Sequence, residues 1–101
     1  MAFDMYAGER HEAIQNHEEY LFAFSAEAIK EFPQLNAIWA SFYSDFTLEP
    51  EQSSELAHEI LTLHDRYESQ GGKTFSAMAL RIAKFFSYSW RNKIPIRCSG
   101  D

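Results

Sequence analysis

Residues 50–72 read PEQSSELAHEILTLHDRYESQGG, and this stretch decides the fold that the sequence predicts. Pro50 suits the first position of a helix, where its missing N–H would have no partner in any case. The apolar residues that follow recur every three or four positions, as on one face of a helix: Leu56, Ile60, Leu63 and Tyr67. The Gly71–Gly72 pair then supplies the left-handed residue that ends many helices.

Two further helices are expected on either side of this one. A helix that begins near Thr74 has a predicted buried face of Phe75, Met78, Ile82 and Phe85 or Phe86. Because the glycine turn before it is short, we predict an antiparallel helical hairpin. Upstream, apolar residues at helical spacing predict a helix from Pro33 or Gln34 to about residues 45–47.

The first 32 residues allow two interpretations. We expect a helix over residues 10–31, but the alternation of Tyr20, Phe22 and Phe24 with smaller residues would also fit a strand. Residues 3–6 and 94–98 are short enough to be edge strands. The predicted fold is therefore a single domain over residues 1–101, mainly α, a small bundle of about four helices, with a short β-pair formed by the termini as an open option.

The sequence has the character of a soluble cytoplasmic protein. No stretch approaches the roughly 18 apolar residues that a membrane span needs, and the first residues carry no basic and apolar signal pattern. One cysteine, Cys98, excludes an internal disulfide and suits a reducing compartment. We expect no membrane association.

Charge is distributed unevenly along the chain, whose net charge is −6. Residues 1–68 hold fourteen carboxylates against three Lys or Arg, whereas residues 69–101 hold six Lys or Arg against one carboxylate. Such asymmetry is either neutralised within the fold or presented to partners of opposite charge.

Catalytic and metal-binding patterns are absent from the sequence. His11 and His17, and likewise His58 and His64, stand six residues apart, which on a helix directs the two rings to different faces. A structural zinc site would also need more than one cysteine. Cys98 has only Arg97 beside it to favour a thiolate. We therefore predict that the chain is not an enzyme and has no catalytic residue, no metal site and no cofactor.

Two surfaces could meet a partner. The basic segment 81–97 carries interleaved aromatic residues, but the acidic remainder would repel a polyanion, so we do not expect nucleic-acid binding. The acidic body is either an ordinary solvated surface or, together with the sixteen aromatic residues of the chain, a site for a basic protein. The candidate partner-binding residues are Tyr43, Asp45, Glu49, Glu51, Glu55, Glu59, Asp65 and Glu68.

Short elements along the chain also resemble a family of small uncharacterised bacterial proteins. They are FDMY at 3–6, HEEYLF at 17–22, FPQL at 32–35, IWxxFY at 38–43, LEPEQ at 48–52 and IRCSGD at 96–101. The resemblance implies one intact domain of bacterial type and supplies no active site. In size and acidity the chain is similar to cytoplasmic immunity proteins, which neutralise a toxin by binding it.

Taken together, these features predict a non-enzymatic protein-binding domain. Its most concrete form is an immunity-type or antitoxin-like protein that neutralises a cognate basic toxin or another basic partner. The alternative is a homo-oligomeric structural or regulatory domain, in which the basic segment 81–97 of one copy meets the acidic helix 49–68 of another.

Overall fold

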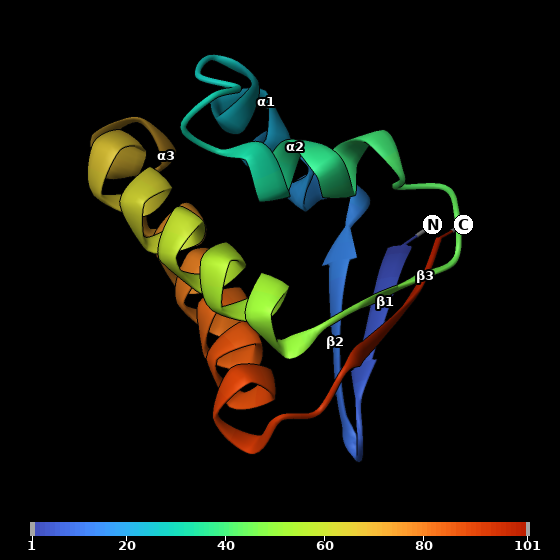
Figure 1. The fold of residues 1–101 in the computed structure, drawn as a ribbon. Helices are drawn as coiled ribbons and strands as arrows, with labels where there is room; N and C mark the ends of the chain where they lie inside the picture. Colours follow the sequence, from blue (N-terminus) through green and yellow to red (C-terminus); the bar gives the residue numbers. More distant parts are fainter. Residues whose placement is uncertain (1, 101) are drawn as a thin grey trace.

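The computed structural model describes residues 2–100 and has an α+β fold, a four-stranded antiparallel sheet with helices on one of its faces (Figure 1). The strands are β1 (Ala2–Ala7), β2 (Arg10–Gln15), β3 (Phe46–Leu48) and β4 (Ile96–Ser99), in the spatial order β2-β1-β4-β3. The helices are the 3-10 turn η1 (Asn16–Glu18), α1 (Tyr20–Ala26), α2 (Pro33–Ala40) and α3 (Pro50–Asn92).

A two-residue turn joins β1 to β2. Gly8, the first turn residue, has φ +60°, and Glu9 is not among the positive-φ residues. This is the pattern of a type II′ turn, which matches the twist of the strands it connects. The turn fixes the register in which Phe3 lies opposite Ile14 and Met5 opposite Glu12.

One face of the sheet is apolar and the other polar. In β1, Phe3, Met5 and Ala7 are fully buried, while Asp4 and Tyr6 between them are only partly covered. The same alternation in β4 buries Ile96 and Cys98. Since successive side chains of a strand point to opposite faces, the buried set marks the face that the helices cover.

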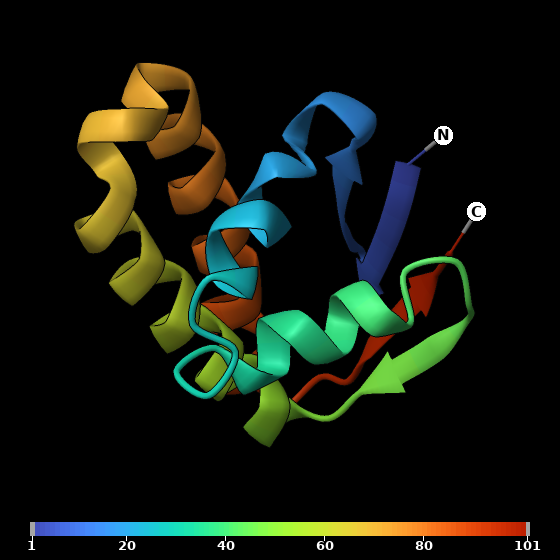
Figure 2. The same cartoon turned by 90° about the horizontal axis from the view of Figure 1, so that it is seen from above.

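The element α3 is a hairpin of two helical halves. A straight helix of its 43 residues would be about 65 Å long, yet the longest dimension of the molecule is 34 Å. The chain reverses at Gly72, whose φ of 69° and ψ of −161° are non-helical. Residues 50–71 (the first half) and 73–92 (the return half) then run antiparallel, as Figure 2 shows.

Aromatic rings join the smaller helices to the sheet. The Phe3 ring of β1 stacks on Phe42, just after α2, with centroids 5.0 Å apart. Phe22 of α1 stacks on Trp39 of α2, also at 5.0 Å. Such ring pairs add to the stabilisation from buried area. Phe3, Phe22 and Phe42 belong to the same core as the buried face of α3.

The structure corrects the predicted fold class. The expectation of a mainly α, all-α bundle of about four helices is wrong, because residues 10–15 form β2, α2 ends at Ala40, and residues 46–48 form β3. The terminal segments do pair, Asp4 opposite Ser99, but as the two central strands of a larger sheet. The predicted reversal at Gly71–Gly72 is confirmed. Met1 and Asp101, which the predicted domain includes, lie outside the described residues.

Candidate protein-binding surface

The eight candidate partner-binding residues are not gathered on one surface. Two lie in the loop between α2 and β3, one caps α3, one is buried, and four lie on the exposed side of the first half of α3. The fold therefore divides the predicted site, and each part has a different role.

Glu59 is the buried member, with 4% of its surface exposed. Its carboxylate accepts hydrogen bonds from the backbone N–H groups of Gln34 at 3.1 Å and Leu35 at 3.0 Å, in the first turn of α2. These N–H groups have no partner within their own helix, and a negative charge is favourable there. Burial raises the pKa of Glu59 above its usual value, and the two N–H groups oppose that shift. Glu59 thus joins α3 to α2.

Tyr43 and Asp45 lie beside the end of β4. Tyr43 is 63% exposed, and its ring stands edge-on to Phe42. Asp45 accepts a hydrogen bond from the backbone N–H of Gly100 at 3.2 Å. The extended strand β3 separates both residues from Glu49, so they do not continue the surface of α3.

Glu49 forms a capping box at the start of α3. Its side chain accepts from the third backbone N–H of the helix, while its own N–H donates to the Gln52 side chain at 2.9 Å. This reciprocal arrangement satisfies two N–H groups that the helix leaves unpaired. The side chain of Glu49 therefore caps the start of α3.

The four remaining carboxylates form what we call the acidic row: Glu51, Glu55, Asp65 and Glu68. All four are exposed, and Leu61, among them, has 49% of its surface exposed. Glu68 lies 3.7 Å from His64. Within residues 2–100, no ion pair engages the other three carboxylates of the row.

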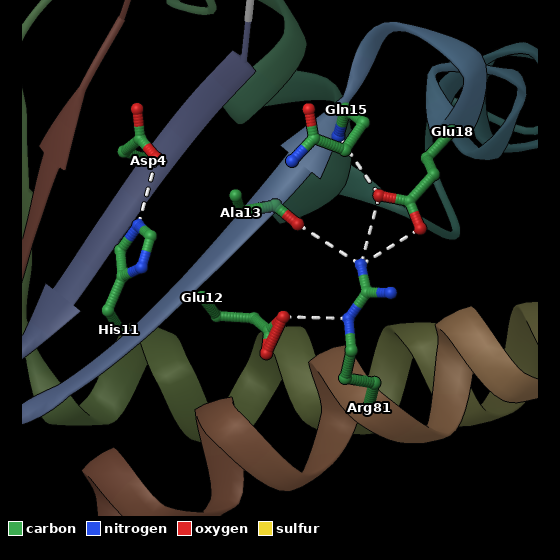
Figure 3. Close-up of polar contacts among 7 residues, drawn as sticks. All are labelled: Asp4, His11, Glu12, Ala13, Gln15, Glu18 and Arg81. Carbon is green, nitrogen blue, oxygen red and sulfur yellow. Dashed lines mark hydrogen bonds and ion pairs between the residues drawn. The ribbon is translucent and has the colours of Figure 1, made fainter.

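A separate ionic cluster surrounds Arg81 of the return half (Figure 3). The guanidinium lies 2.7 Å from Glu12 of β2 and 2.9 Å from Glu18, and it also donates to the backbone carbonyl of Ala13 at 3.1 Å. Glu18, 5% exposed, accepts the backbone N–H of Gln15 at 2.9 Å. Sequence spacing could not find this cluster, because 63 positions separate Arg81 from Glu18.

The Arg81 cluster closes one end of an exposed sheet edge. β2 is an edge strand, and unpaired backbone groups of such strands are templates for pairing with other chains. Here the carbonyl of Ala13 accepts a hydrogen bond from Arg81, and the N–H of Gln15 donates one to Glu18. The cluster thus has a structural role that accounts for the buried carboxylate of Glu18.

A shallow cavity of about 340 Å³ adjoins this cluster, between β2 and the return half of α3. Its charged groups are engaged with their neighbours, except for Lys84, which lines the cavity and has no ion pair within residues 2–100. Glu12 is paired with Arg81, His11 lies 2.8 Å from Asp4, and the guanidinium of Arg10 covers the Tyr88 ring. No free acid and base therefore converge there for proton transfer.

Neither Ser76 nor Cys98 is arranged as a catalytic nucleophile. Ser76 lies 2.8 Å from His64, but the same ring nitrogen, Nε2, also faces Glu68. A catalytic triad needs the acid on the opposite nitrogen of the ring. Cys98 is 1% exposed, and burial raises the pKa of its thiol to about 12. The thiol therefore stays protonated near neutral pH.

The described part of the chain holds neither a cluster of metal ligands nor a helix suited to a membrane. Among residues 2–100, no group of three or more His, Cys, Asp or Glu side chains is placed to hold a metal ion. None of the helices over the same residues has the length and apolar character to cross a membrane.

Comparisons with protein-family models, with curated proteins and with solved structures find no match. The resemblance to small bacterial proteins therefore stays a prediction.

Proposed function

We propose that this chain is a non-enzymatic protein-binding domain, and that the acidic row of α3 binds a basic surface of its partner. The observation that carries the proposal is that the carboxylates of the row are exposed and mostly without an ion pair within residues 2–100. Three of the four have no such pair, and half-exposed Leu61 lies among them. Charges of one sign steer the approach of a partner, and an apolar side chain supplies contact area once it has docked.

The partner class follows from the charge of the row. A basic protein fits it, and the immunity-type or antitoxin-like inhibitor of a basic toxin expected from the sequence is a concrete form of the proposal. Such a protein would act in the cytoplasm. The engaged polar groups around Arg81 and the protonated thiol of Cys98 favour this binding role over an enzymatic one.

The test is affinity capture from an extract of the cells that encode the chain, at low salt, where exposed charges are least screened. The variant is Glu55→Lys, and its matched control is Glu9→Lys, which makes the same charge change at an exposed turn. We expect wild type and E9K to retain a basic protein and E55K to retain at least about tenfold less. Equal retention by E55K, or no basic protein at low salt, would contradict the proposal.

A further inference from the structure

The outer face of the α3 hairpin carries a second row of charges, opposite in sign to the first. On the return half, three exposed basic residues form what we call the basic row: Lys73, Lys84 and Arg91. Leu80, in this row, has 47% of its surface exposed. In Figure 1 and Figure 2 no other element covers the side of the hairpin that is remote from the sheet. Leu80 and Lys84 also line the shallow cavity beside β2.

Contacts between the two halves fix how the rows are aligned. The hydroxyl of Ser89 donates to that of Ser53 at 3.1 Å, and His64 lies 2.8 Å from the Ser76 hydroxyl. In this antiparallel register, pairs of outer-face residues lie at the same level of the hairpin: Glu51 with Arg91, Leu61 with Leu80, and Glu68 with Lys73.

These matched charges do not pair with each other inside one chain. Within residues 2–100, no ion pair joins a member of the acidic row to a member of the basic row. Buried residues of both halves face the core, so the exposed rows project from the opposite side of each helix. The charges are therefore available to another surface.

We infer that this face binds a second copy of the same chain, about a twofold axis parallel to the two helices. Rotation about that axis lays the first half of one copy over the return half of the other while keeping each residue at its level. Glu51 then faces Arg91 of the second copy, Glu68 faces its Lys73, and Leu61 faces its Leu80. A twofold axis across the helices would instead place the acidic rows against each other.

A second copy supplies a basic surface for the acidic row, because opposite charges or leucines meet at three levels of the face. In a twofold interface each contact occurs twice, so the same match is made on both sides of the axis. Half-exposed leucines lie at the centre and charged residues lie around them, which is the usual distribution in a protein interface. The inference rests on the proposed function, since it names a partner for the same acidic row.

Sedimentation velocity of the purified chain tests the inference. The series is wild type, Lys73→Glu, Glu68→Lys and the double variant E68K/K73E, with Lys30→Glu as a charge-matched control in an exposed loop. We expect wild type and K30E to dimerise at low salt and to dissociate as salt is added. Each single reversal creates two like-charge contacts and should weaken the dimer at least about tenfold. The double variant exchanges the charges and should restore it to within about threefold of wild type.

Three results would overturn the second copy as partner. They are a wild-type monomer at every protein and salt concentration, a dimer that K73E leaves unchanged, and a double variant as weak as the single ones. If the chain is monomeric but still captures a basic protein through Glu55, only this inference fails and the proposed function stands. Circular dichroism of each variant confirms that weakened association is not a loss of folding.

Discussion

At the residue scale, Glu59 differs from every other member of the predicted acidic surface. Its position could have been suspected, because it stands three residues after Leu56 and four before Leu63, on the apolar side of the helix. The sequence does not reveal that two N–H groups of α2 would meet it there. Contacts between residues more than 20 positions apart depend on the tertiary fold.

Glu59 should make stability depend on pH in a definite direction. Because burial raises its pKa above the usual 4.5, the folded chain holds this proton more tightly than the unfolded chain. That contribution to stability is complete below the unfolded-state pKa and is lost as pH rises through the folded-state value. Urea unfolding should therefore show wild type losing stability relative to Glu59→Gln as pH rises from about 4 to 7.

The control for this titration is Glu51→Gln, which removes an exposed carboxylate from the same helix. Its difference from wild type should vary little over the same pH range. If the difference between wild type and E59Q is also independent of pH, Glu59 does not have the raised pKa that its burial implies.

At the element scale, the hairpin was predictable, whereas of the sheet only the pairing of the terminal segments was foreseen, and only as an option. The apolar stripe of residues 56–67 and the Gly71–Gly72 pair are local signals, and they indicate both helical halves and the reversal between them. By contrast β3 has three residues and β4 has four. Strand β1 pairs with β4 across most of the chain. Strands this short are specified mainly by their partners. The sequence therefore left a pairing of the terminal segments only as an option, and it did not indicate β3.

The Arg81 cluster joins α3 to β2, and its contribution to stability can be measured by removing the Arg81 guanidinium. Arg81→Ala leaves the buried carboxylate of Glu18 without its charged partner. Since the Arg81 side chain is itself 42% exposed, the loss should be moderate, about 2 kcal/mol of unfolding free energy. Urea unfolding in about 0.5 M salt, where surface pairs are screened, measures it.

Lys84→Ala is the matched control, because Lys84 is an exposed base on the same helix with no ion pair among residues 2–100. It should change stability by no more than about 0.5 kcal/mol. The double variant E18Q/R81A should recover part of the loss, since it no longer buries an unpaired charge. Equal effects of R81A and K84A would refute the role assigned to the cluster.

At the scale of the whole molecule, the charge asymmetry becomes an arrangement of two parallel rows. The change of sign at Gly71–Gly72 is visible in the sequence. Contacts within the fold decide which charges are free to face a partner. Arg81 pairs with Glu18, and Glu59 accepts a hydrogen bond from Leu35, so neither residue belongs to a row. The sequence therefore indicated the sign of the charge on the first half of α3, but not which of its carboxylates are exposed. Its role in binding a partner stays a prediction.

The reversal of α3 at Gly72 places its first half beside its return half, and the proposed arrangement of the two rows depends on it. Spin labels at Ser54→Cys and Ser87→Cys, in a Cys98→Ser background, measure this directly by pulsed electron paramagnetic resonance. Dilution with unlabelled protein limits the measurement to distances within one chain. Adjacent antiparallel helices place the labels roughly 20 Å apart. A continuous helix would place them about 50 Å apart, and that result would contradict the account.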